Sequence, residues 1–379
     1  MMSPALDHVL TDLVAGDFRQ RWEAIKQLPA FGNEAIAPLL ALLTAAEEAE
    51  DEELQWFIVR SLGSYDHPQV MAVLVDILMA PADEDLNAAA IMALAQLGEA
   101  SIAAVMPLLQ RVERRAQAVQ ILACLHTSNA VAPLLSVIDD NDPAVRAQAI
   151  SALGAFQSPE ILPALLVALK DPVVVVRREA AVALGRDRER LGELDWIEHL
   201  GQCLWDVDLS VRQAAASALG HLGVAGAVPH LAKVLKSPHQ SESLKLSVIR
   251  SLGWIDQETA LNILIATWDD GSESLRLAIV EAIGRSLKPQ LRQQSQQCLR
   301  GWLALLLGDP HGKGLKQSLA LTLGRWQDQA SISLLQQLAT DLDQQVQAHA
   351  AAALRLMGLP STPGPADAPP PLATFDTKS

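Results

Sequence analysis

Aromatic residues are scarce in this sequence. They make up 4% of its 379 residues, with one Tyr and five Phe, although half of the chain is apolar. The apolar half excludes wholesale disorder. An ordinary globular core uses more Phe and Tyr, so this one is built on Ala, Leu and Val. Such a composition indicates many thin, similar layers of structure.

Cysteine, basic charge and long apolar runs are also in short supply. Three scattered Cys exclude a disulfide scaffold and indicate a reducing compartment, which we take to be the cytoplasm. The 44 acidic side chains exceed the 29 basic ones, and the net charge of -15 argues against nucleic acid or anionic lipid as the main partner. No apolar run reaches the roughly 18 residues of a membrane helix. Met1–Gly16 has no basic cluster before an apolar core, so we expect no signal peptide and no membrane insertion.

What the chain has instead is a ten-residue pattern that recurs about every 33 residues. Its last residue, called the marker here, is most often Gly, and positions are counted back from it. The best copies are VRAQAISALG at Val145–Gly154, VRREAAVALG at Val176–Gly185 and VRQAAASALG at Val211–Gly220. The interval from Gly284 to Gly324 is longer by about seven residues, and Asp309–Gly314 is its expected exposed loop. The markers fall at residues 29, 63, 95, 124, 154, 185, 220, 253, 284, 324 and 355.

Each repeat unit is predicted to form two helices. The first helix carries a Pro-Leu-Leu motif, as in Ile36–Leu43, and its Pro fits the first turn, where the amides have no intrahelical partner. The second helix is the recurring pattern, with apolar residues nine, five, four and one before the marker on a single face. Gly at the marker suits a left-handed C-terminal cap. Between two helices, Ala46–Glu53 is expected to be an acidic loop.

Charged residues recur at two further positions. Asp stands twelve before the marker, where it predicts an N-cap for the second helix. Lys or Arg stands eight before the marker. The Asp residues are Asp17, Asp51, Asp83, Asp142, Asp208 and Asp343, and the basic residues are Arg21, Arg146, Arg177, Arg212, Lys245, Arg276 and Lys316.

These residues resemble the HEAT repeat and, at this short period, its phycobilisome-lyase-type HEAT-like subclass. The resemblance covers about residues 4–358. It implies an all-α fold, a right-handed α-solenoid or superhelix of about eleven stacked helix pairs, with the second helices lining the concave face. The recurring Asp and Arg residues then form a structural ladder between neighbouring repeats. We expect one elongated domain at residues 1–358 and a disordered, Pro-rich tail at residues 359–379.

Signals of catalysis and of metal binding are missing from the sequence. There is no Cys-x-x-Cys, and Cys124, Cys203 and Cys298 lie about three repeats apart, too far to share an ion, so we expect each to be buried as a small apolar side chain. The His-Glu dipeptides that bind iron in deoxyhypusine hydroxylase, a HEAT-like enzyme family, do not occur. No nucleotide loop and no Gly-x-Ser-x-Gly elbow is found. We therefore expect no enzymatic activity, no cofactor and no metal.

A candidate partner site lies on the second helices of the first two repeats. The positions seven, six and three before the marker are not claimed by the core, and in most repeats they are small or polar. In the first two repeats they include Trp22, Trp56 and Phe57, flanked by Lys26 and Arg60. Large aromatic residues beside basic ones are favoured at protein-binding hot spots. The alternative is that these side chains cap the open end of the solenoid.

The remaining large apolar side chains give weaker signals. Leu246 and Leu277, both seven before a marker, form a second candidate patch. Trp residues on the first helices are expected to pack between layers, namely Trp196, Trp205, Trp268 and Trp302.

Three functions compete on these observations. The first is a non-enzymatic scaffold or adaptor that holds one or more proteins on the concave face of the solenoid. The second, implied by the resemblance alone, is a bilin lyase-like or phycobilisome-associated role. The third is an accessory role in iron–sulfur or other metal-cofactor assembly, in which a partner supplies most of the ligands.

Overall fold

The structure is a computed structural model that describes residues 3–80, 83–186, 195–286 and 288–360. Helices and turns make up this described part, and no strand occurs in it. The predicted α-solenoid is confirmed, because the helices follow one another in pairs from α1/α2 to α21/α22. The chain divides into two compact units, Met1–Asp187 and Arg188–Ser379. Most of the tail predicted at residues 359–379 lies outside the described residues.

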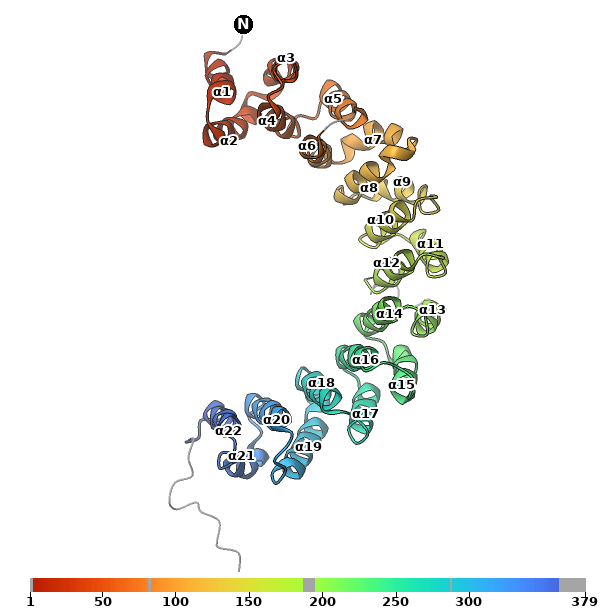
Figure 1. Cartoon of the computed structure of the whole chain (residues 1–379), viewed down its shortest axis with the longest axis vertical. Coiled ribbons are helices and arrows are strands. Elements are labelled where there is room, and N and C mark those ends of the chain that lie inside the picture. The colour runs from red at the N-terminus through yellow and green to blue at the C-terminus, as the bar shows by residue number, and fades with distance from the viewer. Residues whose placement is uncertain (1–2, 81–82, 187–194, 287, 361–379) are drawn as a thin grey trace, which may run out of the picture. The chain divides into compact units, whose positions relative to one another are not determined.

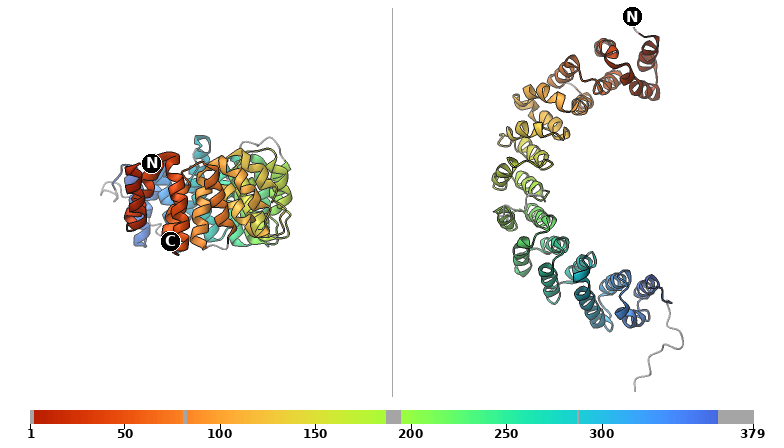
Figure 2. Two further views of the ribbon diagram at one scale, coloured as in Figure 1. Left: turned by 90° about the horizontal axis from the view of Figure 1, so that it is seen from above. Right: turned by 180° about the vertical axis from the view of Figure 1, so that it is seen from behind.

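The first unit is a stack of helix pairs in chain order (Figure 1). Each even-numbered helix is the second helix of a repeat, and from α2 to α12 each contacts the next second helix in this unit. Within this unit the second helices lie along one side and the first helices along the other, as Figure 2 also shows. The helices are α1 (Pro4–Ala15), α2 (Phe18–Gln27), α3 (Ile36–Glu48), α4 (Glu52–Leu62), α5 (Pro68–Met79), α6 (Glu84–Gln96), α7 (Ile102–Leu109), α8 (Arg115–Cys124), α9 (Val131–Leu135), α10 (Pro143–Leu153), α11 (Ile161–Ala168) and α12 (Val174–Leu184).

The second unit repeats this arrangement with its own helix pairs. Its second helices, α14 to α22, again contact one another in order. The long interval before Gly324 lengthens the first helix α19 to 18 residues, and Lys313 and Gly314 already belong to α20, so the predicted loop is shorter than expected. The helices are α13 (Asp195–Cys203), α14 (Leu209–Leu222), α15 (Val228–Lys236), α16 (Glu242–Ile255), α17 (Glu258–Thr267), α18 (Glu273–Gly284), α19 (Pro289–Leu306), α20 (Lys313–Arg325), α21 (Ile332–Leu338) and α22 (Gln344–Leu356).

Small apolar side chains form the core of every layer. In α10 the four predicted positions are Val145, Ala149, Ile150 and Leu153, and all four are buried. Stacked helix pairs bury each face against the next pair, so small apolar side chains fill most of the core, and buried rings such as Phe57 and Trp196 are exceptions. The scarcity of aromatic residues therefore follows from the thickness of the layers.

The marker glycines do not form left-handed caps. Gly154 has φ −63°, an ordinary helical value, and the same holds for Gly63 at φ −60°. The reason for Gly is a close approach of two second helices. A Cβ at Gly154 would lie 2.8 Å from Cβ of Ala183, and one at Gly324 would lie 2.6 Å from Cα of Ala353. The left-handed prediction was wrong because the steric demand comes from the neighbouring repeat and not from the chain's own turn.

The predicted N-caps are confirmed. Each of the Asp residues twelve before a marker accepts a hydrogen bond from a backbone N–H in the first turn of its second helix. Asp17 also forms a capping box, because the side chain of Gln20 accepts from the Asp17 N–H in return. These caps fix where six of the second helices begin.

Two local predictions were wrong, one about a loop and one about the position of a marker. Ala46–Glu53 is mostly helical, since α3 runs to Glu48 and α4 begins at Glu52. In α8 the buried set Ala118, Val119, Ile121 and Leu122 matches the other repeats only when the marker is Ala123. Cys124 therefore lies one residue past the marker, and its thiol side chain is exposed instead of buried.

One helical stretch in the described residues, 18–48, is long and apolar enough to cross a membrane by length and composition alone. It is made of α2, the 3-10 turn η1 (Leu28–Ala35) and α3. Gly32 interrupts it with φ 55° and ψ −143°, outside the helical region. The break leaves α3 with 13 residues, short of the about 20 that a spanning helix needs. The stretch is therefore two successive helices of the first two repeats.

Candidate functional site

The side chains at the predicted partner site form a row of stacked rings on α2 and α4. Trp22 stacks on Trp56 with ring centroids 6.4 Å apart and planes 19° from parallel. Phe18, one turn before Trp22 on α2, stacks on it at 6.4 Å and 6°. We call Phe18, Trp22 and Trp56 the aromatic stripe. Trp22 and Trp56 are half-buried, while Phe18 is 59% exposed.

Phe57 is not part of the exposed surface. Its side chain is fully buried, and its ring meets those of Phe18, Trp22 and Trp56 edge-on at centroid distances of 5.2, 6.3 and 5.1 Å. The stripe thus covers Phe57. The prediction that Phe57 contacts a partner was wrong, because in α4 the position six before the marker turns into the core. Phe18 was missed, although its place directly after the N-cap Asp17 puts it at the solvent-facing start of α2.

The two predicted cations lie over the rings. The guanidinium of Arg60 is 5.3 Å from the Trp22 centroid and 5.4 Å from that of Trp56. The ammonium of Lys26 is 5.8 Å from the Trp22 centroid and also pairs with Glu23 at 2.8 Å. Cation–π contacts of this kind are worth about 0.5–1 kcal/mol at exposed sites. They hold the indole rings in one orientation in the absence of a partner.

Beside the stripe is a groove of about 500 Å³, which we call the acidic groove. Phe18, Trp56 and Leu86 supply its apolar walls, and carboxylates from α4 and α6 supply its charge. The Asp83 carboxylate caps α6, and Glu53 pairs with Arg21 at 3.3 Å. The complete lining is Phe18, Glu52, Glu53, Gln55, Trp56, Asp83, Asp85 and Leu86.

The second candidate patch is less open to solvent. Leu246 on α16 and Leu277 on α18 are both half-buried. Leu277 lies over Gly314 of α20, where a Cβ would be 3.7 Å from a Leu277 methyl group. The Leu277 side chain therefore packs against the neighbouring second helix α20.

The remaining Trp residues are divided between core and surface. Trp196 is buried in α13, and Trp268 stacks on Trp302 at 3.9 Å with both rings buried. Trp205 was expected to pack between layers, but it follows the end of α13 and is 49% exposed. The turn after a first helix faces solvent, so that prediction was wrong.

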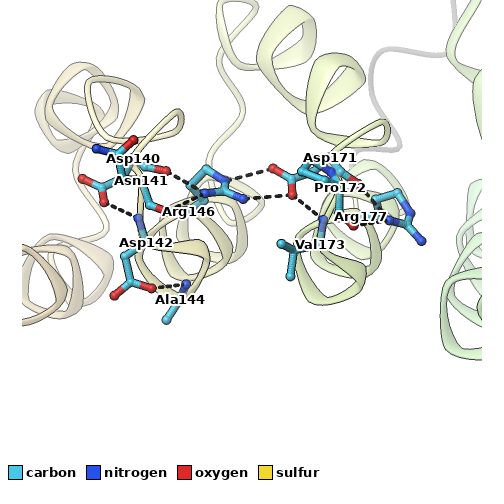
Figure 3. A network of polar contacts seen from close by, with 9 residues as sticks. All are labelled: Asp140, Asn141, Asp142, Ala144, Arg146, Asp171, Pro172, Val173 and Arg177. Atoms are coloured by element: carbon cyan, nitrogen blue, oxygen red, sulfur yellow. Dashed lines mark hydrogen bonds and ion pairs between the residues drawn. The ribbon is translucent and has the colours of Figure 1, made fainter.

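An inter-repeat ladder is present, and it pairs a different Asp from the one expected. Arg146 donates to both carboxylate oxygens of Asp171, at 2.9 and 3.0 Å, and to the carbonyl of Asp140 in its own repeat at 2.7 Å (Figure 3). Asp171 stands fourteen before the next marker, not twelve. In this repeat the residue twelve before the marker is Val173, which has no carboxylate, so the cation bonds Asp171, two residues earlier.

Other repeats use the same geometry with variations. Lys316 bonds Asp341 at 2.7 Å, and Arg115 bonds Asp140. In the first repeat Arg21 reaches the cap residue Asp51 as well as Glu53. Three other cations of the predicted ladder have different partners: Arg177 donates to the Asp171 carbonyl, Arg212 to Gln240 and Arg276 to the Trp268 carbonyl. Lys313, which the repeat pattern did not single out, pairs with the cap residue Asp343.

The ladder changes the acidity of its carboxylates. Burial alone would raise the pKa of Asp171, but the hydrogen bonds from Arg146 and from the Val173 N–H outweigh it and lower that pKa below its ordinary value. The same balance, with Lys316 and the Asp343 N–H as donors, lowers the pKa of Asp341. The bonded Asp171 in turn raises the pKa of Arg146. Arg146 and both carboxylates are therefore charged near neutral pH.

The cysteine and histidine side chains form no metal site among the described residues. In the part of the chain that the structure describes, no three His, Cys, Asp or Glu side chains gather closely enough to hold a metal ion. Cys203 is buried and Cys298 is half-buried, and burial raises the pKa of the Cys298 thiol. His67 caps α5 by accepting from the Gln69 N–H, and His230 pairs with Glu198 at 3.4 Å.

Comparison with solved structures shows similarity in fold. A chain of the structure in which Kap95p binds RanGDP is 14% identical with a TM-score of 0.58, over 93% of this chain and 54% of that one. Importin beta in a polyethylene glycol condition is 13% identical with a TM-score of 0.57, over 93% of this chain and 59% of that one. The complex of CpcE and CpcF of phycocyanin lyase from Nostoc sp. PCC7120 is 22% identical over 60% of this chain and 86% of that one, but its TM-score is 0.36. At these identities the likeness extends to the fold and no further.

Comparison with protein families is more specific. No protein of curated function matches the sequence. The family model of HEAT repeats matches residues 6–95, 39–123, 102–185, 131–206 and 197–284, which together span most of the chain. The repeat spacing, the paired helices and this match agree, and the chain belongs to the HEAT-repeat family.

Proposed function

We propose that this chain is a non-enzymatic scaffold that holds a partner protein on the second helices of its first two repeats. The observation that supports the proposal is the aromatic stripe with Arg60 and Lys26 over it. Trp and Arg are the residues that most often carry binding energy at protein interfaces. Here they are held in place by ring stacking and cation–π contacts before any partner binds, which lowers the entropic cost of association.

The surrounding residues favour a protein as the ligand. The groove beside the stripe is open, and the site combines exposed rings, both signs of charge and amide groups. A metal or a nucleotide would need a closer set of ligands or a phosphate-binding loop. The three free cysteines favour a reducing compartment, and we propose that the scaffold acts in the cytoplasm.

The test is capture of proteins from the native source on the immobilised full chain, followed by mass spectrometry. The variant Phe18→Ser with Arg60→Glu changes the exposed ring of the stripe and the cation that lies over both indoles, and it leaves the Trp22 and Trp56 rings over Phe57 in place. We expect this variant to lose the captured partner while its helical circular dichroism and melting temperature stay near those of the wild type.

The matched control is Trp254→Ala, which removes a ring that is 41% exposed and stacks on His221 in the other unit. It should retain the partner. Equal capture by the wild type, by Phe18→Ser with Arg60→Glu and by Trp254→Ala would contradict the proposal, because the stripe would then contribute nothing to binding.

A further inference from the structure

We propose that the partner enters the acidic groove with an arginine-bearing basic segment. This inference rests on the proposed scaffold function and names the chemistry of the segment that binds there. Three properties of the site support it, namely the unpaired carboxylates, the exposed ring faces and the open volume between α2, α4 and α6.

The groove carries more negative charge than its own cations neutralise. Glu52 and Asp85 are exposed and form no ion pair with any residue that the structure describes. Glu53 shares Arg21 with Asp51, so one cation serves two carboxylates. The carboxylate of Asp83 accepts one backbone N–H and has further acceptor capacity. A cationic group would therefore find at least two free carboxylates and two partly used ones.

The cations beside the stripe do not neutralise the negative charge of the acidic groove. Lys26 is paired with Glu23, and Arg60 lies over the indole rings of Trp22 and Trp56. Neither residue is among those that line the groove. An acidic ligand would meet repulsion from the groove, whereas a basic ligand would meet attraction from it.

The ring faces favour arginine over lysine. Phe18 and Trp56 border the groove, and Phe18 is more than half exposed. A guanidinium is planar, stacks on aromatic faces and can bond a carboxylate through two parallel N–H groups, while an ammonium is a compact, strongly hydrated charge. The site already uses this chemistry internally, since Arg60 lies over two of its rings. A volume of about 500 Å³ is of the size that pockets for small ligands have, and so it accommodates an arginine side chain with its flanking backbone.

The experiment measures binding of a fluorescent peptide of Gly-Arg repeats to the full chain by anisotropy. Peptides of Gly-Lys and Gly-Glu repeats of equal length are run beside it. We expect the Gly-Arg peptide to bind more tightly than the Gly-Lys peptide, the Gly-Glu peptide not to bind, and added salt to weaken binding through screening.

Two variants locate the binding. Glu52→Gln with Asp85→Asn should weaken Gly-Arg binding by about tenfold, because it removes the two unpaired carboxylates. The matched control, Glu258→Gln with Asp270→Asn, removes two exposed carboxylates from the second unit and should change binding less than about twofold. Absent binding, equal binding of the Gly-Glu peptide, or equal effects of the two double variants would each overturn the inference.

The capture experiment separates this inference from the proposed function. If Glu52→Gln with Asp85→Asn binds the peptide as the wild type does, while native capture still depends on Phe18 and Arg60, the scaffold stands and the basic segment is wrong. If native capture is independent of Phe18 and Arg60, the scaffold proposal fails, and the peptide assay still reports on the groove by itself.

Discussion

At the scale of single residues, glycine is required at one helical position, Gly324, and is not required at another, Gly301. A Cβ at Gly324 would lie within 2.6–3.0 Å of backbone atoms of Ala353 in the next second helix. A Cβ at Gly301, on the first helix α19, meets nothing within 4 Å. Glycine costs a helix about 0.5–1 kcal/mol relative to alanine. The repeat therefore tolerates that cost at Gly324 because the layers could not otherwise approach.

We predict opposite effects of alanine at these two positions. Gly324→Ala should destabilise the protein by about 1–3 kcal/mol, because backbone atoms of α22 cannot move aside as a side chain can. Gly301→Ala should stabilise it by about 0.5–1 kcal/mol through helix propensity. Urea denaturation followed by circular dichroism measures both. A Gly324→Ala variant as stable as Gly301→Ala would show that the close approach is not needed.

Tyr65, the one tyrosine of the sequence, is a probe of burial in the first unit. It is 3% exposed, its hydroxyl has no hydrogen-bond partner, and burial raises its pKa from 10.0 to about 12. The folded state thus holds the Tyr65 proton more tightly than the unfolded state does. The stabilisation is fully present below pH 10 and is lost as the pH rises toward 12.

We therefore expect tyrosinate absorbance to appear near pH 12 in the native protein and near pH 10 in urea. The control Tyr65→Phe keeps the ring and removes the unsatisfied hydroxyl. It should be at least as stable as the wild type below pH 10 and should lose less stability above it. A native tyrosinate transition near pH 10 would mean that the side chain is open to solvent.

At the scale of helices and layers, the ladder joins neighbouring second helices at their first turns. The side chains of Arg146 and Asp171 are mostly buried, and the bidentate contact is supplemented by the Asp140 carbonyl and the Val173 N–H. Removing one partner leaves a largely buried charge without compensation. The ladder thus penalises any shift of one layer relative to the next.

We predict a coupling free energy of about 1–3 kcal/mol between Arg146 and Asp171 in a double-mutant cycle of Arg146→Met and Asp171→Asn. The pH dependence follows from the lowered pKa of Asp171. Its folded pKa lies below the unfolded value of 3.8, so the stabilisation is present above that pH and is lost as the pH falls through the folded pKa. The stability difference between the wild type and Arg146→Met should accordingly shrink below about pH 4. A difference that is constant from neutral to acid pH would contradict the ion pair.

At the scale of the whole molecule, each repeat contacts its neighbours, so stability is a sum of local terms. The units Met1–Asp187 and Arg188–Ser379 each contain their own series of stacked second helices. We predict that either unit, expressed alone, retains native helical circular dichroism and a cooperative urea transition. Fragments with coil-like spectra would show instead that residues 1–358 fold as one indivisible domain.

The repeat pattern identified most of the candidate site, but not all of it. Trp22, Trp56, Lys26 and Arg60 could be named from the sequence because equivalent positions of adjacent repeats share a face. The ring stacking and the Arg60 contact then arise from that spacing. Phe57 was misplaced because the repeat alignment does not show which side of α4 packs into the core. Phe18 was missed because it lies at the start of α2, outside the aligned ten-residue pattern.

The sequence by itself determined the fold class, the helix pairs, the N-caps and the absence of a large aromatic core. These follow from local rules, namely apolar spacing, capping chemistry and residue volume, which act within a dozen residues. The tertiary structure alone decided why the marker is Gly, which Asp completes the ladder and where the acidic groove opens. Each of these depends on distances between residues about one repeat apart, and those distances are set only when the layers pack.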